Sequence, residues 1–107
     1  MRVLLVDDEP GVLRALERLF RRRGHEVRTA PNGMVALSLL DEFPPDVVVS
    51  DFLMDGMTGV ELLRRIATRF PEARRVLLSG FAEVAGPIDA MFLRKPYDAQ
   101  TLLQACE

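Results

Sequence analysis

Short apolar runs alternate along the chain with longer segments in which apolar residues recur every three or four positions. Runs of the first kind are typical of buried strands, and segments of the second kind predict amphipathic helices. The expected strands are 2–6, 26–30, 46–50, 74–79 and 91–95. The expected helices lie at 11–24, 34–43 and 59–70, and a last helix begins after Asp98. The chain is therefore expected to consist of repeated strand–helix units.

This alternation predicts an α/β fold, in which right-handed crossovers place helices on both faces of one parallel sheet. The uninterrupted valines at 47–49 indicate a strand covered on both faces, whereas the weak alternation at 26–30 indicates a more exposed strand. The interval 81–90 is short for a helix, and Gly86-Pro87 would break one there. We expect a flavodoxin-like (βα)5 fold, a doubly wound five-stranded parallel sheet in which helix four is reduced or missing.

Several helix ends carry the residues that usually mark them. Pro10 suits the first turn of the first helix, and Gly24 suits the position just after its end. Thr58 and Glu61 form a capping-box pattern at the start of the third helix, and Asp98 is expected to cap the last one. These signals mark helix boundaries independently of the apolar pattern.

Size and composition narrow the class of protein. At 107 residues, with 49% hydrophobic and 28% charged residues, the chain suits one globular domain spanning 1–107. The net charge of −2 gives no indication of nucleic-acid or membrane binding, and the basic run 21–23 is expected to be a solvated helix end. Because no apolar run is long enough to cross a membrane and the amino end lacks a signal-peptide pattern, we expect a cytoplasmic protein.

Cysteine and histidine each occur only once. Cys106 has no second cysteine with which to form a disulfide, which fits a reducing compartment, and its place on an apolar helix face favours packing. His25 lies at a helix-to-strand junction among charged residues, without the partners that a general base or a metal ligand needs. We therefore look for the chemistry of the chain elsewhere.

Polar and charged residues gather where the expected strands end. In chain order these residues are Asp7, Asp8, Asp51, Ser79 and Lys95. Parallel strands bring their carboxyl ends to one edge of the sheet, where the ligands of open α/β sheets bind. We therefore expect three carboxylates, a hydroxyl group and an ammonium group to meet in one crevice.

This set of groups favours metal-assisted phosphoryl transfer. Adjacent carboxylates repel one another unless a cation lies between them, and hard oxygen ligands of this kind suit Mg²⁺. The amine of Lys95 and the hydroxyl of Ser79 can contact further oxygens of a phosphoryl group, while a carboxylate acts as the nucleophile and forms an acyl phosphate. Each residue alone has a plain structural explanation, such as a cap or a turn. Their order at the ends of four strands is what favours a function.

Four segments strongly resemble the receiver domain of two-component response regulators. They are LLVDDEP (4–10), PDVVVSDFLMDGMTGVELL (45–63), RVLLSGFA (75–82) and FLRKPYD (92–98), and they span nearly the whole chain. The resemblance implies that Asp51 accepts a phosphoryl group from the phosphohistidine of a sensor histidine kinase or of a phosphotransfer protein. It also implies that the domain catalyses only its own phosphorylation and dephosphorylation and is otherwise not an enzyme.

The same resemblance implies which residues bind the cofactor, Mg²⁺. Asp7 and Asp8 are its expected ligands, assisted by Asp51 and by the backbone carbonyl of Leu53. Leu53 and Phe81 also occupy positions that flank the phosphorylation site in this family. Because both side chains are apolar and keep attacking water away, we predict slow loss of the phosphoryl group.

The resemblance further implies a conformational switch. Ser79 and Lys95 would contact the phosphoryl group, and the Lys95–Pro96 bond is expected to be cis. Movement of Ser79 toward that group would let the ring of Phe92 swing inward. Since phenylalanine has no hydroxyl group to form a hydrogen bond in the outward position, we expect an inward ring even without phosphate.

Two features depart from the pattern of the family. Asp55 stands where a proline usually follows the methionine, and it adds a fourth carboxylate near the loop. Ser79 and Lys95 are only 16 positions apart, which is too few for a full fourth helix. The alternative function is therefore that of a pseudo-receiver, which would bind protein partners without being phosphorylated.

Two other protein classes fit the sequence poorly. An aspartyl-phosphate hydrolase of the haloacid-dehalogenase kind needs a second acid two residues after its nucleophile, where this chain has Leu53. A dinucleotide-binding protein needs a G-x-G-x-x-G motif after the first strand, and this chain has none there.

Overall fold

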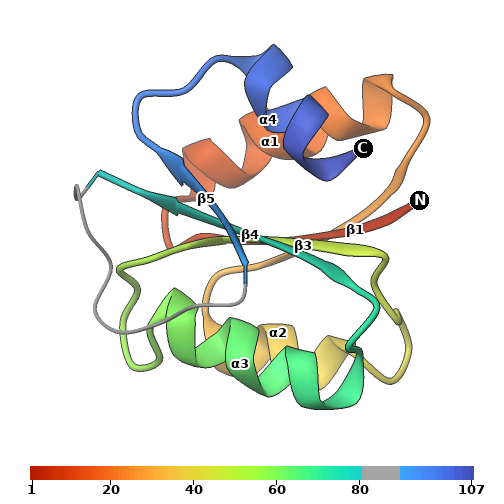
Figure 1. Ribbon diagram of the computed structural model, residues 1–107, viewed down its shortest axis with the longest axis vertical. Helices are drawn as coiled ribbons and strands as arrows, with labels where there is room; N and C mark the ends of the chain where they lie inside the picture. The colour runs from red at the N-terminus through yellow and green to blue at the C-terminus, as the bar shows by residue number, and fades with distance from the viewer. Residues whose placement is uncertain (81–89) are drawn as a thin grey trace.

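Figure 1 shows the fold as a computed structural model, which describes residues 1–80 and 90–107. The strands are β1 (Arg2–Val6), β2 (Glu26–Ala30), β3 (Val47–Asp51), β4 (Arg74–Ser79) and β5 (Met91–Arg94). The helices are α1 (Pro10–Arg22), α2 (Gly33–Leu39), α3 (Gly59–Arg69) and α4 (Ala99–Cys106), which is the last helix of the chain. The expected alternation of strands and helices is confirmed.

The strands of the described residues form one parallel sheet in the order β2-β1-β3-β4-β5. The helices α1 and α4 cover one face of this sheet, and α2 and α3 cover the other (Figure 1). The order changes direction at β1, so the crevice beyond the ends of β1 and β3 is the expected place for a ligand. This arrangement confirms the flavodoxin-like, doubly wound fold, with a shortened connection between β4 and β5.

Two apolar cores lie between the sheet and its helices. Side chains alternate along a strand, so Leu4 and Val6 join the core beneath α2 and α3, while Val3 and Leu5 join the core beneath α1 and α4. All four are at most 2% exposed. Burial of such side chains contributes about 1.5–3 kcal/mol each, so both faces of β1 stabilise the fold. The expected burial of both faces of β3 is confirmed as well.

Most of the expected helix signals are present. Gly24 follows the end of α1 with a φ of 86°, a conformation that glycine adopts without strain. The Oγ1 atom of Thr58 accepts a 3.2 Å hydrogen bond from the backbone N–H of Glu61 at the start of α3. At the start of α4, Oδ1 of Asp98 accepts a 2.7 Å hydrogen bond from the N–H of Thr101. Each cap satisfies a backbone donor that the helix leaves unpaired.

Several element boundaries differ from the expectation, by one to four residues. β3 includes Asp51, because this residue still pairs with β4 in the sheet. α2 ends at Leu39 rather than at residue 43, because the N–H of Leu40 bonds to the oxygen of Leu37 and tightens the last turn. β5 ends at Arg94, so the expected lysine follows this strand instead of ending it.

Some expectations concern residues that are not described. The flanking role of Phe81 and the break at Gly86-Pro87 both fall within 81–89, outside the described residues. None of the helices in the described ranges is long and apolar enough to cross a membrane.

Candidate functional site

The carboxyl ends of the strands meet at one edge of the sheet. Val6 of β1 pairs with Ser50 of β3, and Ser79 of β4 pairs with Arg94 of β5. The residues that follow Val6, Ser50 and Arg94 are two of the expected acids and the expected lysine. The sheet register therefore brings these side chains and Ser79 to the same edge.

Three carboxylates form an acidic cluster at this edge. One oxygen from each of Asp7, Asp8 and Asp51 lies within 4.8 Å of the other two. Asp7 is only 2% exposed, and its Oδ1 accepts a 2.9 Å hydrogen bond from the backbone N–H of Glu9. Its Oδ2 has no hydrogen-bond partner among the described residues. Burial raises the pKa of Asp7 more than the hydrogen bond from Glu9 lowers it, and the charge of Asp51 raises the pKa further.

The acidic cluster has the ligand chemistry of a divalent cation site. A buried carboxylate oxygen without a partner costs about 1–3 kcal/mol or more, and a cation would supply the missing partner of Asp7. Mg²⁺ is bound by one or two carboxylates together with waters and phosphate oxygens. Asp7 is buried, Asp51 is partly buried and Asp8 is exposed, so one side of the cluster is open to solvent. The residues present therefore fit Mg²⁺.

Lys95 forms an ion pair with Asp51. The distance from its Nζ to Oδ1 of Asp51 is 2.8 Å, and the two side chains are 36% and 14% exposed. Burial is the largest single influence on the pKa of Lys95 and lowers it, but the hydrogen bond and charge of Asp51, together with the charge of Asp7, outweigh burial and raise the pKa overall. Lys95 therefore remains an ammonium group beside the acidic cluster at neutral pH.

The backbone around Lys95 fixes its position. Its N–H donates a 2.8 Å hydrogen bond to the carbonyl oxygen of Ser79, which links the ends of β4 and β5. The Lys95–Pro96 peptide bond is cis, as the resemblance implied. Ser79 itself is 1% exposed and lies at the last position of β4.

Gly59 is a structural part of the site that sequence reasoning missed. A Cβ atom at this position would lie 2.2 Å from the carbonyl oxygen of Asp51 and 2.7 Å from Cδ1 of Leu77. Only glycine therefore lets the start of α3 approach the end of β3 this closely. The available signal was a glycine directly after the helix cap Thr58, but which backbone it would meet depends on the tertiary fold.

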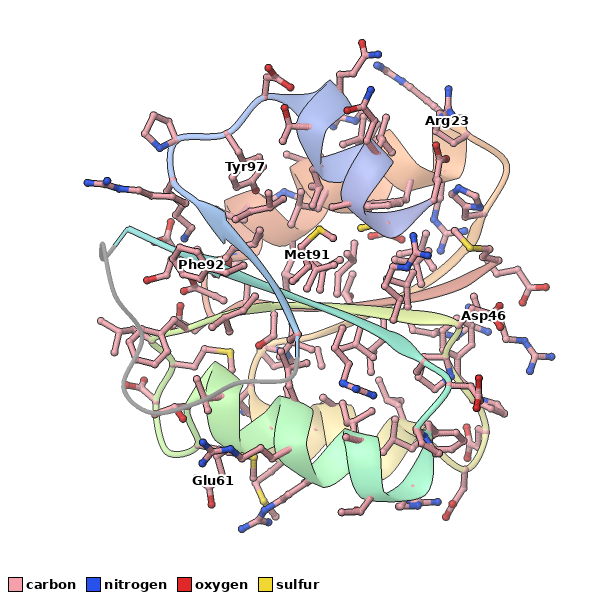
Figure 2. All side chains as sticks on the ribbon, in the orientation of Figure 1. Arg23, Asp46, Glu61, Met91, Phe92 and Tyr97 are labelled. Atoms are coloured by element: carbon pink, nitrogen blue, oxygen red, sulfur yellow. The ribbon has the colours of Figure 1, made fainter. Side chains whose placement is uncertain are left out.

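The remaining expected residues surround the cluster. Phe92 lies on β5 (Figure 2), is half-buried and packs against the core beneath α2 and α3. Leu53 and Asp55, in the loop after β3, are both exposed, Leu53 to 53%. Phe92 therefore belongs to the α2–α3 core, while the loop side chains face solvent.

Tyr97 was not singled out by the sequence analysis, although it follows Lys95 by two residues. Figure 2 shows it beyond the end of β5, on the side of the sheet where α1 and α4 lie. The residue packs against the core on that side, and burial raises the pKa of its hydroxyl group. The charges of Lys95, Asp7 and Asp51 also act on this pKa, so Tyr97 lies within electrostatic reach of the acidic cluster.

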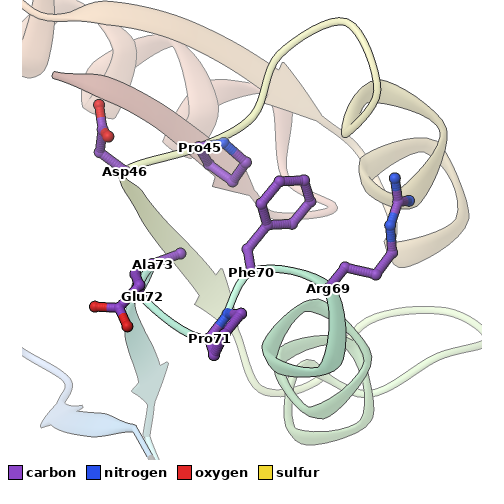
Figure 3. A pocket seen from close by; sticks show the side chains of 7 residues that line it. All are labelled: Pro45, Asp46, Arg69, Phe70, Pro71, Glu72 and Ala73. Carbon is purple, nitrogen blue, oxygen red and sulfur yellow. The ribbon is translucent and has the colours of Figure 1, made fainter.

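A surface hollow at the opposite edge of the sheet is separate from this site. Figure 3 shows the residues that line it. Phe70 follows the end of α3, Pro45 and Asp46 precede β3, and Ala73 precedes β4. It therefore lies at the amino ends of these strands. The three carboxylates and the ammonium group lie together at the other edge, not at this hollow.

Comparisons with known proteins identify the family of the chain. The family model of the response regulator receiver domain matches residues 3–107. The chain is 34% identical to the regulatory protein AtoC of Escherichia coli K12, over 94% of this chain and 23% of AtoC. It is 32% identical to the response regulator receiver protein CpdR of Brucella abortus, over 99% of this chain and 93% of CpdR.

A solved structure gives the same result. The response regulator TrrA of Thermotoga maritima, in complex with Mg²⁺ and BeF, matches with a TM-score of 0.85 and 28% identity, over 96% of this chain and 93% of TrrA. The chain thus spans nearly all of CpdR and of the TrrA structure but about a quarter of AtoC. Because the family match extends over 3–107, the chain belongs to the response regulator receiver domains of two-component signalling systems.

Proposed function

We propose that residues 1–107 act as a phosphoacceptor receiver domain in the cytoplasm, in which Asp51 takes a phosphoryl group from a phosphohistidine in a Mg²⁺-dependent reaction. The donor is a sensor histidine kinase or a phosphotransfer protein, and the phosphorylated domain changes its interactions with other proteins. The observation that carries this proposal is the 2.8 Å ion pair of Lys95 with Asp51, beside Oδ2 of Asp7, which has no hydrogen-bond partner in the described part of the chain. Lys95, Asp51 and Asp7 thus offer an ammonium group, a nucleophile and a cation ligand in one place.

In the proposed reaction, a carboxylate oxygen of Asp51 attacks the phosphorus atom in line with the bond to the donor's imidazole nitrogen. That bond breaks, its electron pair returns to the imidazole, and Asp51 becomes an aspartyl phosphate. Lys95 transfers its contact from the carboxylate to a phosphoryl oxygen, and the hydroxyl group of Ser79 donates a hydrogen bond to another. Later attack by water releases inorganic phosphate and restores the carboxylate. The domain thus catalyses only its own phosphorylation and dephosphorylation.

The cofactor has a defined place in this proposal. Asp7, Asp8 and Asp51 would hold Mg²⁺, with the backbone carbonyl of Leu53 as a further ligand. When bound, Mg²⁺ neutralises charge on the phosphoryl oxygens. The fit of the three carboxylates to a hard cation supports this, and so does the similarity to TrrA, whose structure is a complex of that protein with Mg²⁺ and BeF.

Labelling by a small phosphodonor tests the proposal. We expect acetyl phosphate with Mg²⁺ to phosphorylate the wild-type protein and to leave Asp51→Asn unlabelled, because the amide is not a nucleophile. A mobility-shift gel that retards phosphoproteins measures the outcome. Asp55→Asn is the matched control, since it removes an exposed carboxylate from the neighbouring loop. Equal labelling of Asp51→Asn and the wild type would disprove the assignment of the acceptor.

The pseudo-receiver remains the second candidate. The short connection between Ser79 and Lys95 favours it, because this connection lies next to the proposed switch residues. A pseudo-receiver would take no label from acetyl phosphate at any Mg²⁺ concentration and would bind its partners equally well with and without the phosphodonor. The labelling experiment therefore separates the two candidates.

A further inference from the structure

The loop between β3 and α3 contains an aspartate that the proposed reaction does not use. Asp55 is exposed, and its carboxylate has no ion-pair partner in 1–80 or 90–107. Gly56 follows it, and Asp55 is the only aspartate in the sequence that precedes a glycine. At such a bond an aspartate most readily forms a cyclic imide with the backbone, because glycine has no side chain to hinder the attacking nitrogen.

The described structure leaves this bond free to rearrange. Asp55 and Gly56 belong to no helix or strand, and the N–H of Gly56 donates no hydrogen bond to any described group. The φ angle of Gly56 is 81°, and no heavy atom beyond its chain neighbours lies within 4 Å of the place where a Cβ atom would stand. The carboxyl carbon of Asp55 can therefore reach the nitrogen of Gly56 without breaking a hydrogen bond of the fold.

The two ends of the same loop are fixed. The N–H of Phe52 donates a 2.9 Å hydrogen bond to the oxygen of Leu78, and the N–H of Gly59 donates one of 2.9 Å to the oxygen of Phe52. Met54 and Met57 are each only 8% exposed. The freedom to rotate is thus confined to the turn between the two methionines.

The chain contains one comparable bond, between Asn32 and Gly33. Asparagine cyclises more readily than aspartate in an unfolded chain, because ammonia leaves more readily than water. In the fold, Oδ1 of Asn32 accepts a 2.9 Å hydrogen bond from the N–H of Val35, and a Cβ atom at Gly33 would lie 2.8 Å from Sδ of Met57. Ring closure would break the cap of α2 and move Gly33 within a tightly packed contact. The fold therefore protects the bond that is intrinsically more reactive.

We propose that the bond between Asp55 and Gly56 is the site at which the folded protein spontaneously forms isoaspartate. The nitrogen of Gly56 attacks the carboxyl carbon of Asp55, and one carboxyl oxygen leaves as water with the proton of that nitrogen and a proton from solvent. Water then attacks the main-chain carbonyl carbon of the resulting succinimide and breaks its bond to the nitrogen. The backbone now runs through the side chain, and the freed α-carboxylate is the group that isoaspartyl methyltransferases esterify with S-adenosylmethionine.

Methyl acceptance measures the modification. Folded protein is incubated at pH 7, and samples are treated with L-isoaspartyl methyltransferase and radiolabelled S-adenosylmethionine. We expect incorporation to rise with time in the wild type and equally in Asn32→Ser, because serine keeps a capping oxygen. Asp55→Glu should lose the rise, since glutamate would have to form a six-membered ring. Asp55→Asn should accelerate it, because ammonia is the better leaving group.

The variants assign the signal, because both bonds lie in one tryptic peptide, 29–64. In urea the wild type should gain methyl groups faster than Asn32→Ser, since unfolding releases the cap. A signal in the folded protein that Asn32→Ser abolishes and Asp55→Glu keeps would overturn the inference. So would a folded wild type that gains no methyl groups while urea-unfolded Asn32→Ser does. None of these measurements involves phosphorylation, so the inference and the proposed function can fail independently.

Discussion

Asp7 combines nearly complete burial with a carboxylate oxygen that no described group satisfies. Its raised pKa has a consequence for folding. A group that binds its proton more tightly in the folded state stabilises the protein below its unfolded pKa, and this contribution is lost as the pH rises through the folded pKa. At neutral pH and without a cation, ionised Asp7 therefore opposes folding.

Asp7→Asn should therefore stabilise the metal-free protein at pH 7, by about 1 kcal/mol. The amide keeps the oxygen that accepts the Glu9 hydrogen bond and carries no charge. The gain should shrink as the pH falls and Asp7 of the wild type becomes protonated. Mg²⁺ should reverse the ranking, because it stabilises the wild type by binding. Urea unfolding between pH 7 and pH 3, with and without Mg²⁺, measures all three effects.

Asp8→Asn is the control for this experiment. Asp8 belongs to the same cluster but is exposed, so its charge is already solvated and its removal should change the metal-free stability less. An equal gain from Asp8→Asn, or a wild type whose stability ignores Mg²⁺, would contradict the role given to the buried carboxylate.

At the level of helices and strands, Gly59 decides how closely α3 approaches β3. Gly59→Ala should lower the free energy of unfolding by about 1–3 kcal/mol, because the new Cβ atom meets the backbone of Asp51. It should also slow labelling by acetyl phosphate, since relief of the clash displaces Asp51. Denaturant unfolding and the labelling rate are the two measurements.

Gly11→Ala provides the comparison. Gly11 lies in the first turn of α1, and its nearest potential contact is the end of the Arg14 side chain at 4.0 Å. Alanine there should be neutral or raise the free energy of unfolding by about 0.5 kcal/mol through helix propensity. If both substitutions had the same effect, close packing at Gly59 would not be the cause.

The elements also show what the sequence could and could not predict. The apolar runs indicated where the strands lie, because a buried strand leaves a local pattern in the sequence. The residues that follow the strands predicted the acidic cluster, because parallel strands end at one edge of the sheet. The early end of α2 and the inclusion of Asp51 in β3 depend on hydrogen bonds that a pattern does not contain. The contact of Gly59 with Asp51 and the position of Tyr97 needed the tertiary fold.

Glu107 adds ion pairs between the end of α4 and the segment after α1. Its carboxylate pairs with Arg23 at 2.6 Å and with His25 at 2.8 Å, and the Arg23 hydrogen bond is the main cause that lowers the pKa of Glu107 to about 2. A lowered pKa adds stability above the ordinary value of 4.5, and the contribution is lost as the pH falls toward 2. Glu107→Gln should therefore lower Tm at pH 7 and have little effect near pH 2. Thermal unfolding followed by circular dichroism measures this, and Glu42→Gln, at an exposed position, should change neither value.

Across the whole molecule, Phe92 is the residue proposed to carry a signal away from the acidic cluster. It lies on the edge strand β5 and packs against the α2–α3 core, one layer away from the site. A phenylalanine ring gains no hydrogen bond by pointing outward. The orientation of the Phe92 ring should therefore differ little between the free and the phosphorylated protein. Crystal structures of the free and the beryllofluoride-bound protein would measure this, and a clear outward-to-inward rotation would refute it.

His25 also brings the two described ends of the chain together. The amino group of Met1 lies 3.3 Å from Nδ1 of His25, and Glu107 lies 2.8 Å from Nε2 of the same ring. Figure 1 places both ends at the side of the sheet where β1 begins, whereas the acidic cluster follows the other ends of the strands. A sensor chip or a fluorescent fusion attached at either end would thus face away from Asp51, and immobilised protein should capture kinases as freely as protein in solution.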